Sequence, residues 1–270
     1  MGENKLDISL KCGKLNMEIS QPRRVLLGND WKYDGVLSRF SRIYFPISGE
    51  GLLTTETESV RLLPGKIYVI PSMLRFSYSC DGRLEKIYSH IHTRLPSGFD
   101  AFSEVGRILR VEDRGECLSL LSYADGGETE GAIYAGAVIS SALVRVAAEN
   151  DVRLRAPEKY GELVSAAIDC VSERLSIKLR ISDVAAALYT SRQVLQREFL
   201  REVGISIGRY IDERVMTECE RRLVAGESID TISEALGFCD RFYLTRRFSE
   251  SYGVSPDKYR RINGFQRRSN

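Results

Sequence analysis

The chain is poor in several residue types whose abundance would restrict its class. It has 7 prolines and 2 histidines in 270 residues, and its 6 cysteines include no C-x-x-C pair. Scattered cysteines in this number predict reduced core or surface thiols rather than a disulfide framework or a zinc site. The composition is 43% hydrophobic and 28% charged, which is ordinary for a soluble protein and excludes disorder or a fibre.

Long apolar segments and a strong net charge are also lacking. The N-terminal sequence MGENKLDISLKCGKLN has no apolar core of a signal peptide, and no apolar run approaches the roughly 20 residues that span a bilayer. These absences predict a cytoplasmic protein without membrane contact. The net charge of +2 does not by itself indicate a nucleic-acid partner, although eight Lys or Arg and only two acids follow position 240.

The N-terminal third of the chain has the pattern of short β-strands. The segments SRIYFPI (residues 41–47), KIYVIP (66–71), RFSYSC (75–80) and LEKIYSHIH (84–92) are rich in β-branched and aromatic residues. The sequences SGEG, PG and DG between them are turn signals. Several short strands at close spacing predict a sandwich or a small barrel.

After about residue 97 the hydrophobic period becomes helical. The segment GAIYAGAVISSALVRVAAEN (131–150) is apolar or small on its faces and needs a partner, either the strand region or a second copy of the chain. A charged segment that ends in Pro157 fits a linker. We therefore predict an α+β protein of two domains, residues 1–150 and an all-α domain at 158–270, joined by a linker at 151–157.

The C-terminal half contains an internal repeat. Residues 196–211, QREFLREVGISIGRYI, align with residues 245–260, TRRFSESYGVSPDKYR, at an offset of 49. The preceding segments DVAAAL and TISEAL correspond at an offset of 48. Agreement over core positions, caps and turns indicates a tandem duplication.

Each repeat predicts two helices joined by a tight turn. Ser182 in the first repeat, and Ser228 or Asp230 in the second, suit the start of the first helix, while Ser191 and Asp240 suit the start of the second. Each second helix would be held by a buried Leu and Phe and would end at a glycine. This is the helix-turn-helix arrangement, whose second helix enters the DNA major groove.

The outer faces of the two second helices carry the candidate DNA-binding side chains. Gln and Arg each present two hydrogen-bonding groups in a plane, which suits the edges of adenine and guanine respectively. A single helix of this kind could be a solvated face, but two in one duplicated domain favour DNA binding. The candidates are Arg192, Gln193, Gln196 and Arg197 in the first unit, and Arg241, Phe242, Thr245 and Arg246 in the second.

The segment from about residue 175 to 261 resembles the DNA-binding domain of AraC/XylS-type bacterial transcriptional regulators. The stretch ISEALGFCDRFYLTRRFSESYGVSPDKYRR (232–261) is similar to the family pattern I-x-x-x-A-x-x-x-G-F, an aromatic pair, F-x-x-x-x-G-x-x-P and Y-R, with one residue fewer between Ile and Ala. More loosely, RIYFPISGEG, LLPGKIYVIPS and EKIYSHIH are similar to the cupin-like effector domain of many members.

The resemblance implies an N-terminal cupin-like β-barrel with flanking helices, and two helix-turn-helix units at about residues 181–203 and 229–252. A long helix at about 207–225 would join these units, with Val215 where an Arg is common. Phe242 stands where many members have a polar residue, and it could contact a thymine methyl group or pack, with packing slightly favoured. The implied partners are double-stranded DNA, a small-molecule effector such as a carbohydrate, a second copy of the chain and RNA polymerase, with activation of transcription and no cofactor.

The two histidines raise the alternative of metal chemistry. His90 and His92 have the H-x-H spacing of metal-dependent barrel enzymes, but a metal site needs three or four ligands. Glu85 and Cys80 are possible further ligands, and neither lies at a telling sequence distance. We therefore expect no metal site and no catalytic site. The candidate walls of an effector pocket are Trp31, Tyr44, Tyr78, Tyr88, His90 and His92, with ordinary core packing as the default for each.

Three functions remain open. The first is a ligand-responsive transcriptional regulator in which an effector changes how the barrel, its helices and the N-terminal arm (about residues 1–20) engage the DNA-binding half. The second is a cupin-type metalloenzyme with an appended helical domain; the lack of a ligand set, a nucleophile constellation or a Gly-rich phosphate loop argues against it. The third is a DNA-binding regulator whose barrel only dimerises.

Overall fold

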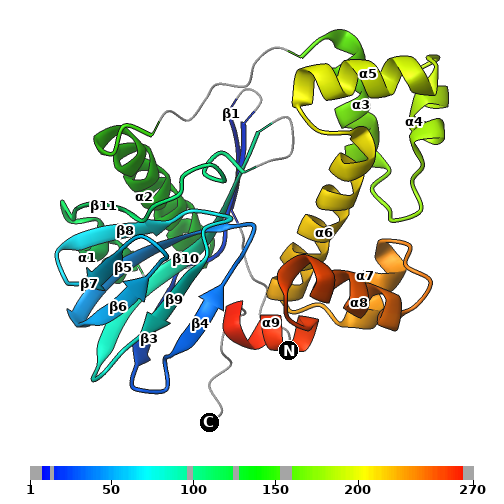
Figure 1. The fold of residues 1–270 in the computed structure, drawn as a ribbon. Helices are drawn as coiled ribbons and strands as arrows, with labels where there is room; N and C mark the ends of the chain where they lie inside the picture. The colour runs from blue at the N-terminus through cyan, green and yellow to red at the C-terminus, as the bar shows by residue number, and fades with distance from the viewer. Residues whose placement is uncertain (1–7, 13–14, 96–99, 124–127, 153–159, 264–270) are drawn as a thin grey trace. The chain divides into compact units, whose positions relative to one another are not determined.

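The structure is a computed structural model that describes residues 8–12, 15–95, 100–123, 128–152 and 160–263. The described residues up to Val152 form one compact unit, and those from Tyr160 onward form a second. Strands and two helices make up the first unit, and helices alone make up the second (Figure 1). Most of the predicted linker, and the beginning of the predicted N-terminal arm, lie outside the described residues.

The strands of the N-terminal unit are β1 (Ile8–Cys12), β2 (Leu15–Ile19), β3 (Arg23–Leu27), β4 (Tyr33–Val36), β5 (Ser41–Gly49), β6 (Gly51–Thr54), β7 (Ser59–Leu62), β8 (Lys66–Ile70), β9 (Phe76–Ser79), β10 (Leu84–Arg94) and β11 (Leu109–Glu112). Its helices are α1 (Glu116–Tyr123) and α2 (Glu128–Glu149). The C-terminal unit comprises α3 (Glu162–Glu173), α4 (Ile181–Ala187), α5 (Arg192–Val203), α6 (Ile207–Ala225), α7 (Ile229–Ala235), α8 (Arg241–Tyr252) and α9 (Pro256–Asn263).

The strands form two antiparallel sheets. The larger has the order β1-β2-β10-β5-β8-β11, with β3 also paired to β10, and the smaller has the order β4-β9-β6-β7. Arg42 of β5 lies 5.2 Å from the ring centroid of Phe76 in β9, so the two sheets face each other. Among the described residues no strand pairing joins them into one closed barrel. The expected barrel is therefore two facing sheets, which is the sandwich alternative of the strand pattern.

The predicted SGEG turn is the point where the chain passes from one sheet to the other. Gly49 ends β5 with a φ of 74°, and Gly51 begins β6. A Cβ atom at Gly49 would lie 1.9 Å from the carbonyl oxygen of Arg83. Only glycine fits there, because the backbone is left-handed and the neighbouring strand is too close for any side chain.

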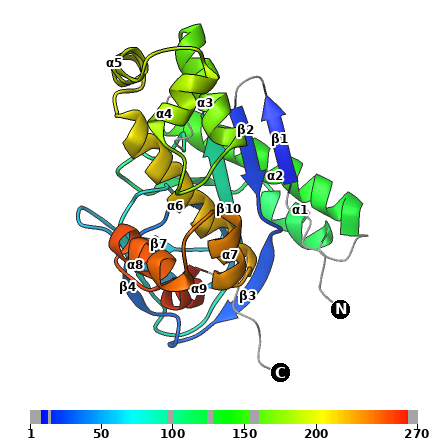
Figure 2. The same cartoon turned by 90° about the vertical axis from the view of Figure 1, so that its right-hand side faces the viewer.

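The alternation of β10 gives the larger sheet two different faces. Ile87 and Ile91 pack in one core with Ile139 and Leu143 of α2. Because successive strand side chains point to opposite faces, the intervening residues project towards the smaller sheet. These are Lys86, Tyr88, His90 and His92. Figure 2 shows α1 and α2 together on the side of the unit away from the smaller sheet.

The expectation that no segment is apolar enough to cross a membrane is wrong for helix α2, by length and composition alone. Its residues from Glu130 to Glu149 reach a mean hydropathy of 1.6, and 50% of that window is buried inside the unit. Ala142, Leu143 and Val146 account for part of this hydropathy, because they pack against the larger sheet. A core helix of a soluble domain meets the same criterion, so one helix of this kind is only weak support for a membrane span.

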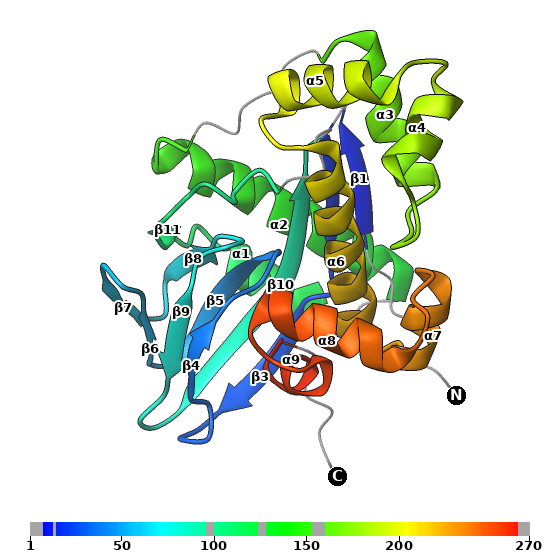
Figure 3. The same ribbon diagram turned by 45° about the vertical axis from the view of Figure 1, so that its right-hand side comes forward.

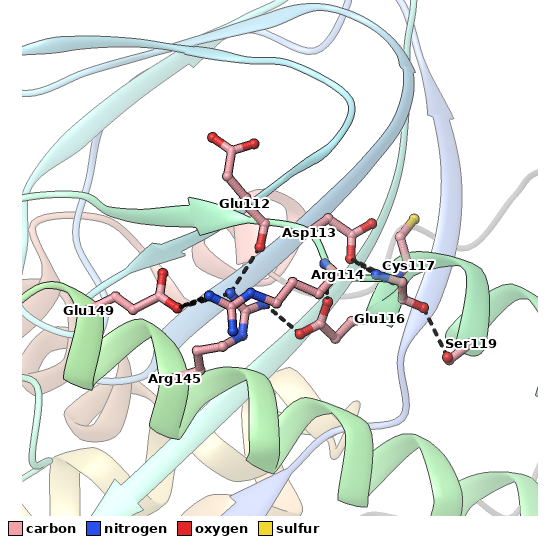
Figure 4. A network of polar contacts seen from close by, with 9 residues as sticks. Glu112, Asp113, Arg114, Glu116, Cys117, Ser119, Arg145 and Glu149 are labelled. Atoms are coloured by element: carbon pink, nitrogen blue, oxygen red, sulfur yellow. Dashed lines mark hydrogen bonds and ion pairs between the residues drawn. The ribbon is translucent and has the colours of Figure 1, made fainter.

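A network of ion pairs fixes α1 to α2 and to the end of β11 (Figure 4). The Arg145 guanidinium donates to Glu116 at 2.5 Å and to the carbonyl oxygen of Glu112 at 2.9 Å. Arg114 adds an ion pair with Glu149 at 2.7 Å. The side chains of Arg145 and Glu116 are only 16% and 17% exposed, so solvent screens their pair weakly.

Glu116→Gln is expected to destabilise the N-terminal unit. Burial opposes ionisation of Glu116, but hydrogen bonds from Asp113, Arg145 and the Arg114 backbone outweigh it and lower its pKa to about 2. A carboxylate with a depressed pKa stabilises the fold fully above its unfolded value of 4.5, and this stabilisation is lost as the pH falls through about 2. The variant should lose about 1–3 kcal/mol in the free energy of unfolding at neutral pH. The free energy of unfolding of the variant should also depend less on pH between 4.5 and about 2.

Denaturation followed by Trp31 fluorescence measures this effect, because Trp31 is the single tryptophan and lies in the same unit. The matched control is Glu112→Gln, whose side chain is 72% exposed and pairs with Lys66 at the surface. The control should change the free energy of unfolding by less than about 0.5 kcal/mol. Equal losses from the two substitutions would show that the buried network has no special structural role.

In the C-terminal unit, α6 connects two similar groups of helices (Figure 3). Helices α3, α4 and α5 pack together at one end of α6, and α7, α8 and α9 pack at the other. Both α5 and α8 are 12 residues long, and their first residues, Arg192 and Arg241, are separated by the offset of the sequence repeat. The structure thus shows the duplication as two helix pairs on one connecting helix.

Candidate DNA-binding interface

Helix α5 presents a largely polar surface because its buried residues, Leu195 and Phe199, lie on one side. The Ser191 hydroxyl accepts a hydrogen bond from the Val194 N–H at 3.2 Å and caps the start of the helix. Gly204, with a φ of 83°, ends it. Leu195 and Phe199 are completely buried one turn apart. On the other side Arg192, Gln193 and Arg197 are exposed and Gln196 is half-buried.

Helix α8 repeats this construction. The Asp240 carboxylate accepts a hydrogen bond from the Tyr243 N–H at 2.7 Å, and Gly253 ends the helix with a φ of 74°. Leu244 and Phe248 occupy the buried positions that correspond to those of α5. Along the outer surface Arg241, Phe242 and Arg246 are exposed and Thr245 is half-buried. Both helices therefore carry basic and polar side chains on a face that the core leaves free.

The first helix of each unit has a different start. Ser228 caps α7 as predicted, because its hydroxyl accepts the Thr231 N–H at 3.0 Å. The prediction that Ser182 caps α4 is wrong. Arg180 occupies the cap position, and its N–H donates to the Asp183 carboxylate at 3.0 Å. Asp183 supplies this capping contact from inside the first turn, so a cap search limited to the residue before the helix misses it.

The turns between the helices use a left-handed residue at matching places. Tyr189 has a φ of 51° in the first unit, and Gly237 has a φ of 74° in the second. A Cβ atom at Gly237 would come within 2.5 Å of the Ser176 hydroxyl, so glycine is required there. Tyr189 meets no such neighbour, and its side chain is 99% exposed.

A buried carboxylate ties the second unit to the connecting helix. Glu220 of α6 is 0% exposed, and it accepts a hydrogen bond from the Tyr252 hydroxyl at 3.2 Å and a shorter one from the Tyr259 hydroxyl. Because Tyr252 ends α8 and Tyr259 lies in α9, the contact fixes both helices to α6. No pattern in the sequence singles out this residue, since Glu220 lies in the charged run ECERR.

The space between the two sheets of the N-terminal unit brings the predicted effector-binding residues together. Trp31 stacks on Tyr78 with 4.5 Å between ring centroids, and Tyr44 meets Tyr88 edge-on at 6.4 Å. Farther along β10, His90 lies 4.3 Å from the ring of Phe40. His92 is buried beside it and lies 5.7 Å from the same ring.

Two further residues in this space, Arg42 and Lys86, were not predicted. They are only 4% and 3% exposed. Burial, and the positive charges of Arg42 and Lys86, hold the pKa of His90 well below its usual value. A sequence signal existed: Lys86 precedes Tyr88 and His90 at alternate positions of one strand, so it had to share their face.

Comparison with known proteins identifies the chain. A family model described as a helix-turn-helix domain matches residues 184–262. The multiple antibiotic resistance protein MarA of Escherichia coli is 36% identical over 97 residues, which cover 36% of this chain and 76% of MarA. The chain belongs to the AraC/XylS family of transcriptional regulators. It is therefore a DNA-binding regulator, and its helix-turn-helix units bind double-stranded DNA.

Two longer matches extend beyond the DNA-binding half of this AraC/XylS regulator. The Msm operon regulatory protein of Streptococcus mutans is 22% identical over 254 residues, 81% of this chain and 83% of that protein. The structure of ToxT from Vibrio cholerae has a TM-score of 0.53 at 15% identity and covers 93% of this chain and 98% of ToxT. This likeness shows a two-domain fold of the same kind, with a sheet-rich N-terminal domain and a helical C-terminal domain.

Two residues depart from the family pattern. Phe242 is 76% exposed, so the slightly favoured expectation that it packs in the core of the regulator is wrong. Its position on the outer surface of α8 leaves contact with a thymine methyl group as the alternative. Val215 is completely buried in α6, which explains why the basic residue common at this position is absent.

Several of the basic residues near the C-terminal end have roles inside the domain. Arg247 pairs with Asp212 of α6 at 3.5 Å, and Arg260 donates to the carbonyl oxygen of Glu227. These two guanidinium groups therefore hold α8 and α9 in place. Arg246 contacts the Tyr243 ring at 5.4 Å and is exposed. Of the other basic residues, Arg267 and Arg268 lie outside the described residues.

The alternative of a metal centre would require a cluster of ligand side chains in the described part of the regulator. No group of three or more His, Cys, Asp or Glu residues comes together there. Glu85 instead pairs with Arg24 at 2.7 Å, and the Cys80 thiol donates to the carbonyl oxygen of Glu50 at 3.4 Å. The two residues weighed as extra ligands for His90 and His92 are thus engaged elsewhere.

Proposed function

We propose that this regulator recognises a specific DNA sequence through α5 and α8, which enter successive major grooves on one face of the DNA. The observation that carries the proposal is the pair of capped, 12-residue helices that expose Arg and Gln in one duplicated domain. In this assignment Arg192, Gln193, Gln196 and Arg197 face the first groove. Arg241, Phe242, Thr245 and Arg246 face the second.

Selection of binding sites from random DNA, followed by footprinting on the selected sites, tests the proposal. Two recognition helices in successive major grooves predict two clusters of required bases about 10 base pairs apart. A single cluster would limit recognition to one helix. Binding without any sequence preference would leave only phosphate contacts and would contradict the assignment.

The N-terminal domain is proposed to sense a small molecule and to transmit its presence to the DNA-binding domain. In this scheme residues 1–150 form the sensing and dimerising domain, 151–157 the linker and 158–270 the DNA-binding domain. The similar fold of ToxT has been solved with an unsaturated fatty acid bound, which supports an effector of low molecular mass. We further propose that the regulator acts in the cytoplasm as an activator, through contact with RNA polymerase. A carbohydrate is the effector class that the family resemblance suggests.

Dimerisation is proposed to use the outer surface of α2. Five residues spaced three or four apart make this surface apolar or small, and all of them are exposed: Ile133, Ala137, Ser141, Val144 and Ala148. Ile133 and Val144 are 62% and 58% exposed despite their size. A second copy of the same helix covers such an uncharged stripe without unpaired charges, as a two-fold symmetric interface requires.

Val144→Glu is therefore expected to weaken the dimer by at least about tenfold, because the interface would bury a carboxylate without a partner. Sedimentation equilibrium of the full chain measures the dissociation constant. The matched control is Leu26→Glu, since Leu26 is 48% exposed but lies on β3. A dimer weakened equally by both substitutions, or by neither, would place the interface elsewhere.

A further inference from the structure

Two basic side chains are buried between the sheets of the N-terminal domain. Arg42 projects from β5 and Lys86 from β10, and both are almost completely buried. Removing an ammonium or guanidinium group from water is costly unless the surroundings compensate the charge. The burial of the Lys86 ammonium, with a second cation in the same interior, therefore needs an explanation that ordinary core packing does not supply.

Aromatic rings provide part of the compensation. The Lys86 ammonium lies 3.3 Å from the centroid of the Tyr44 ring and 4.1 Å from that of Trp31. Arg42 lies 4.6 Å from the Phe40 ring and donates a hydrogen bond to the Ser38 hydroxyl at 2.6 Å. Ring faces attract cations, but they contribute less than a charged partner does.

The nearby carboxylates that the structure describes are engaged with other groups. Glu18 pairs with Arg94 at 3.4 Å, and Glu85 with Arg24 at 2.7 Å. Asp100 accepts hydrogen bonds from the Thr93 N–H and the Ser72 hydroxyl. Among described residues, no carboxylate forms an ion pair with Lys86. The positive charge of Arg42 instead adds to that of Lys86, and burial together with this repulsion holds the pKa of Lys86 well below its usual value.

Three aromatic residues of this interior are in partial contact with solvent. Trp31, Tyr78 and Tyr88 are each half-buried, whereas the charged groups beneath them are not exposed. Trp31 and Tyr78 are stacked and offer flat apolar surface beside the Lys86 ammonium. The arrangement combines partly exposed rings with the positive charge of the buried Lys86 beside them.

We propose that the interior between the two sheets binds a small organic anion, whose carboxylate or phosphate pairs with Lys86 and Arg42 while its carbon body packs against Trp31 and Tyr78. An anion supplies the negative charge that the described part of the domain does not place beside Lys86. The Arg42 guanidinium also suits a carboxylate or phosphate, because both can accept two parallel hydrogen bonds. This inference rests on the proposed sensing role and narrows it, since a neutral carbohydrate would leave Lys86 without an anionic partner among the described residues.

Calorimetric titration of the full-length protein with matched pairs of acid and neutral compound tests the proposal. The acids are octanoate, trans-cinnamate and glucose 6-phosphate, and their neutral counterparts are octanamide, cinnamamide and glucose. At least one acid should bind at least about tenfold more tightly than its neutral counterpart. The carboxylates and the phosphate distinguish the two sources of the anionic group. Failure of every acid, or equal binding of acid and neutral compound, would overturn the proposal.

Substitution of Lys86 locates the site. Lys86→Met should weaken binding of the acid by about 10- to 100-fold and leave the affinity for any neutral ligand unchanged. Lys86→Arg keeps the charge and should restore most of the affinity. The matched control Lys66→Met removes a lysine that pairs with Glu112 at the surface, and it should bind the acid as the wild type does. Unchanged affinity in Lys86→Met, with Trp31 fluorescence showing a folded domain, would overturn the assignment.

The same titrations separate this inference from the proposed function. If a neutral sugar binds the wild type and Lys86→Met equally, the sensing role is retained and the proposal of an anionic ligand is refuted. Binding of an acid that is lost in Lys86→Met, with no effect of the acid on DNA affinity, would keep the anion site and refute the sensing role.

Discussion

Replacing Phe248 with alanine is expected to lower the free energy of unfolding of the DNA-binding unit by about 3–5 kcal/mol. Phe248 is 0% exposed and contacts two other rings of the same core. Its ring centroid lies 4.3 Å from that of Tyr252 and 5.1 Å from that of Tyr259. Since both tyrosines donate to the buried Glu220, a cavity at Phe248 would also loosen the contacts that hold α8 and α9 to α6.

Phe242 provides the matched control in the same helix. Its side chain is 76% exposed, so Phe242→Ala should change the free energy of unfolding by less than about 0.5 kcal/mol. If Phe242 contacts a thymine methyl group, this variant should lose DNA affinity on the order of 1 kcal/mol instead. The two phenylalanines, six residues apart, would then separate stability from recognition.

Urea denaturation with two probes measures the difference. Far-UV circular dichroism reports mainly the C-terminal unit, which contains seven of the nine described helices, whereas Trp31 fluorescence reports the N-terminal unit. Phe248→Ala should shift the helical transition to lower urea and leave the Trp31 transition in place. A shift of both transitions by the same amount would mean that the two units unfold together, and an unchanged helical transition would contradict the burial of Phe248.

The helical half of the protein was largely predictable because its determinants are local. The repeat offset set the positions of α5 and α8, and the caps Ser191 and Asp240 lie where their side chains reach the backbone three residues later. The exposed faces of α5 and α8 followed from the buried Leu and Phe of each helix. Once one face of a helix is known, the directions of all its remaining side chains are set.

In the sheet-rich half, the sequence predicted individual strands but not how these strands pair. Whether strands close into a barrel depends on pairings between distant segments, such as β10 with β2 and β3, and no local pattern specifies these pairings. Lys86 illustrates the same limit. Its alternation with Tyr88 and His90 placed it on the inner face, but a lysine near a turn is usually solvated. Only the position of Arg42 on the neighbouring strand shows that two cations share one interior.

Long-range contacts also determine whether a charged side chain pairs within the domain or extends into solvent. Sequence reasoning counted Arg246 and Arg247 together among the basic residues that follow position 240, and it named only Arg246 as a DNA-binding candidate. The structure separates them, because Arg247 lies against Asp212 of α6 and Arg246 extends from the outer surface of α8. Glu220 is the strongest example, since the tyrosines that bury it follow it by 32 and 39 residues.

Arg246→Ala is expected to weaken binding to the specific DNA site by about 1–3 kcal/mol and to relax the preference at one base pair. The Arg246 guanidinium lies 5.4 Å from the Tyr243 ring, which restricts it without consuming its hydrogen-bond donors. Arg197 in α5 should contribute less. Its Nε donates to Glu198 at 2.9 Å, and a base must displace this carboxylate before it can pair with the guanidinium.

Fluorescence anisotropy with the selected DNA site, and with the same site changed at each base pair in turn, measures both affinity and preference. Arg247→Ala is the control, because its contacts with Asp212 and Glu250 lie within the domain, and it should leave the preference at every position intact. If Arg246→Ala weakens binding to all sequences equally, Arg246 contacts a phosphate and does not read a base. If Arg197→Ala costs as much as Arg246→Ala, the ion pair with Glu198 does not compete with DNA, and the two recognition helices contribute equally to specificity.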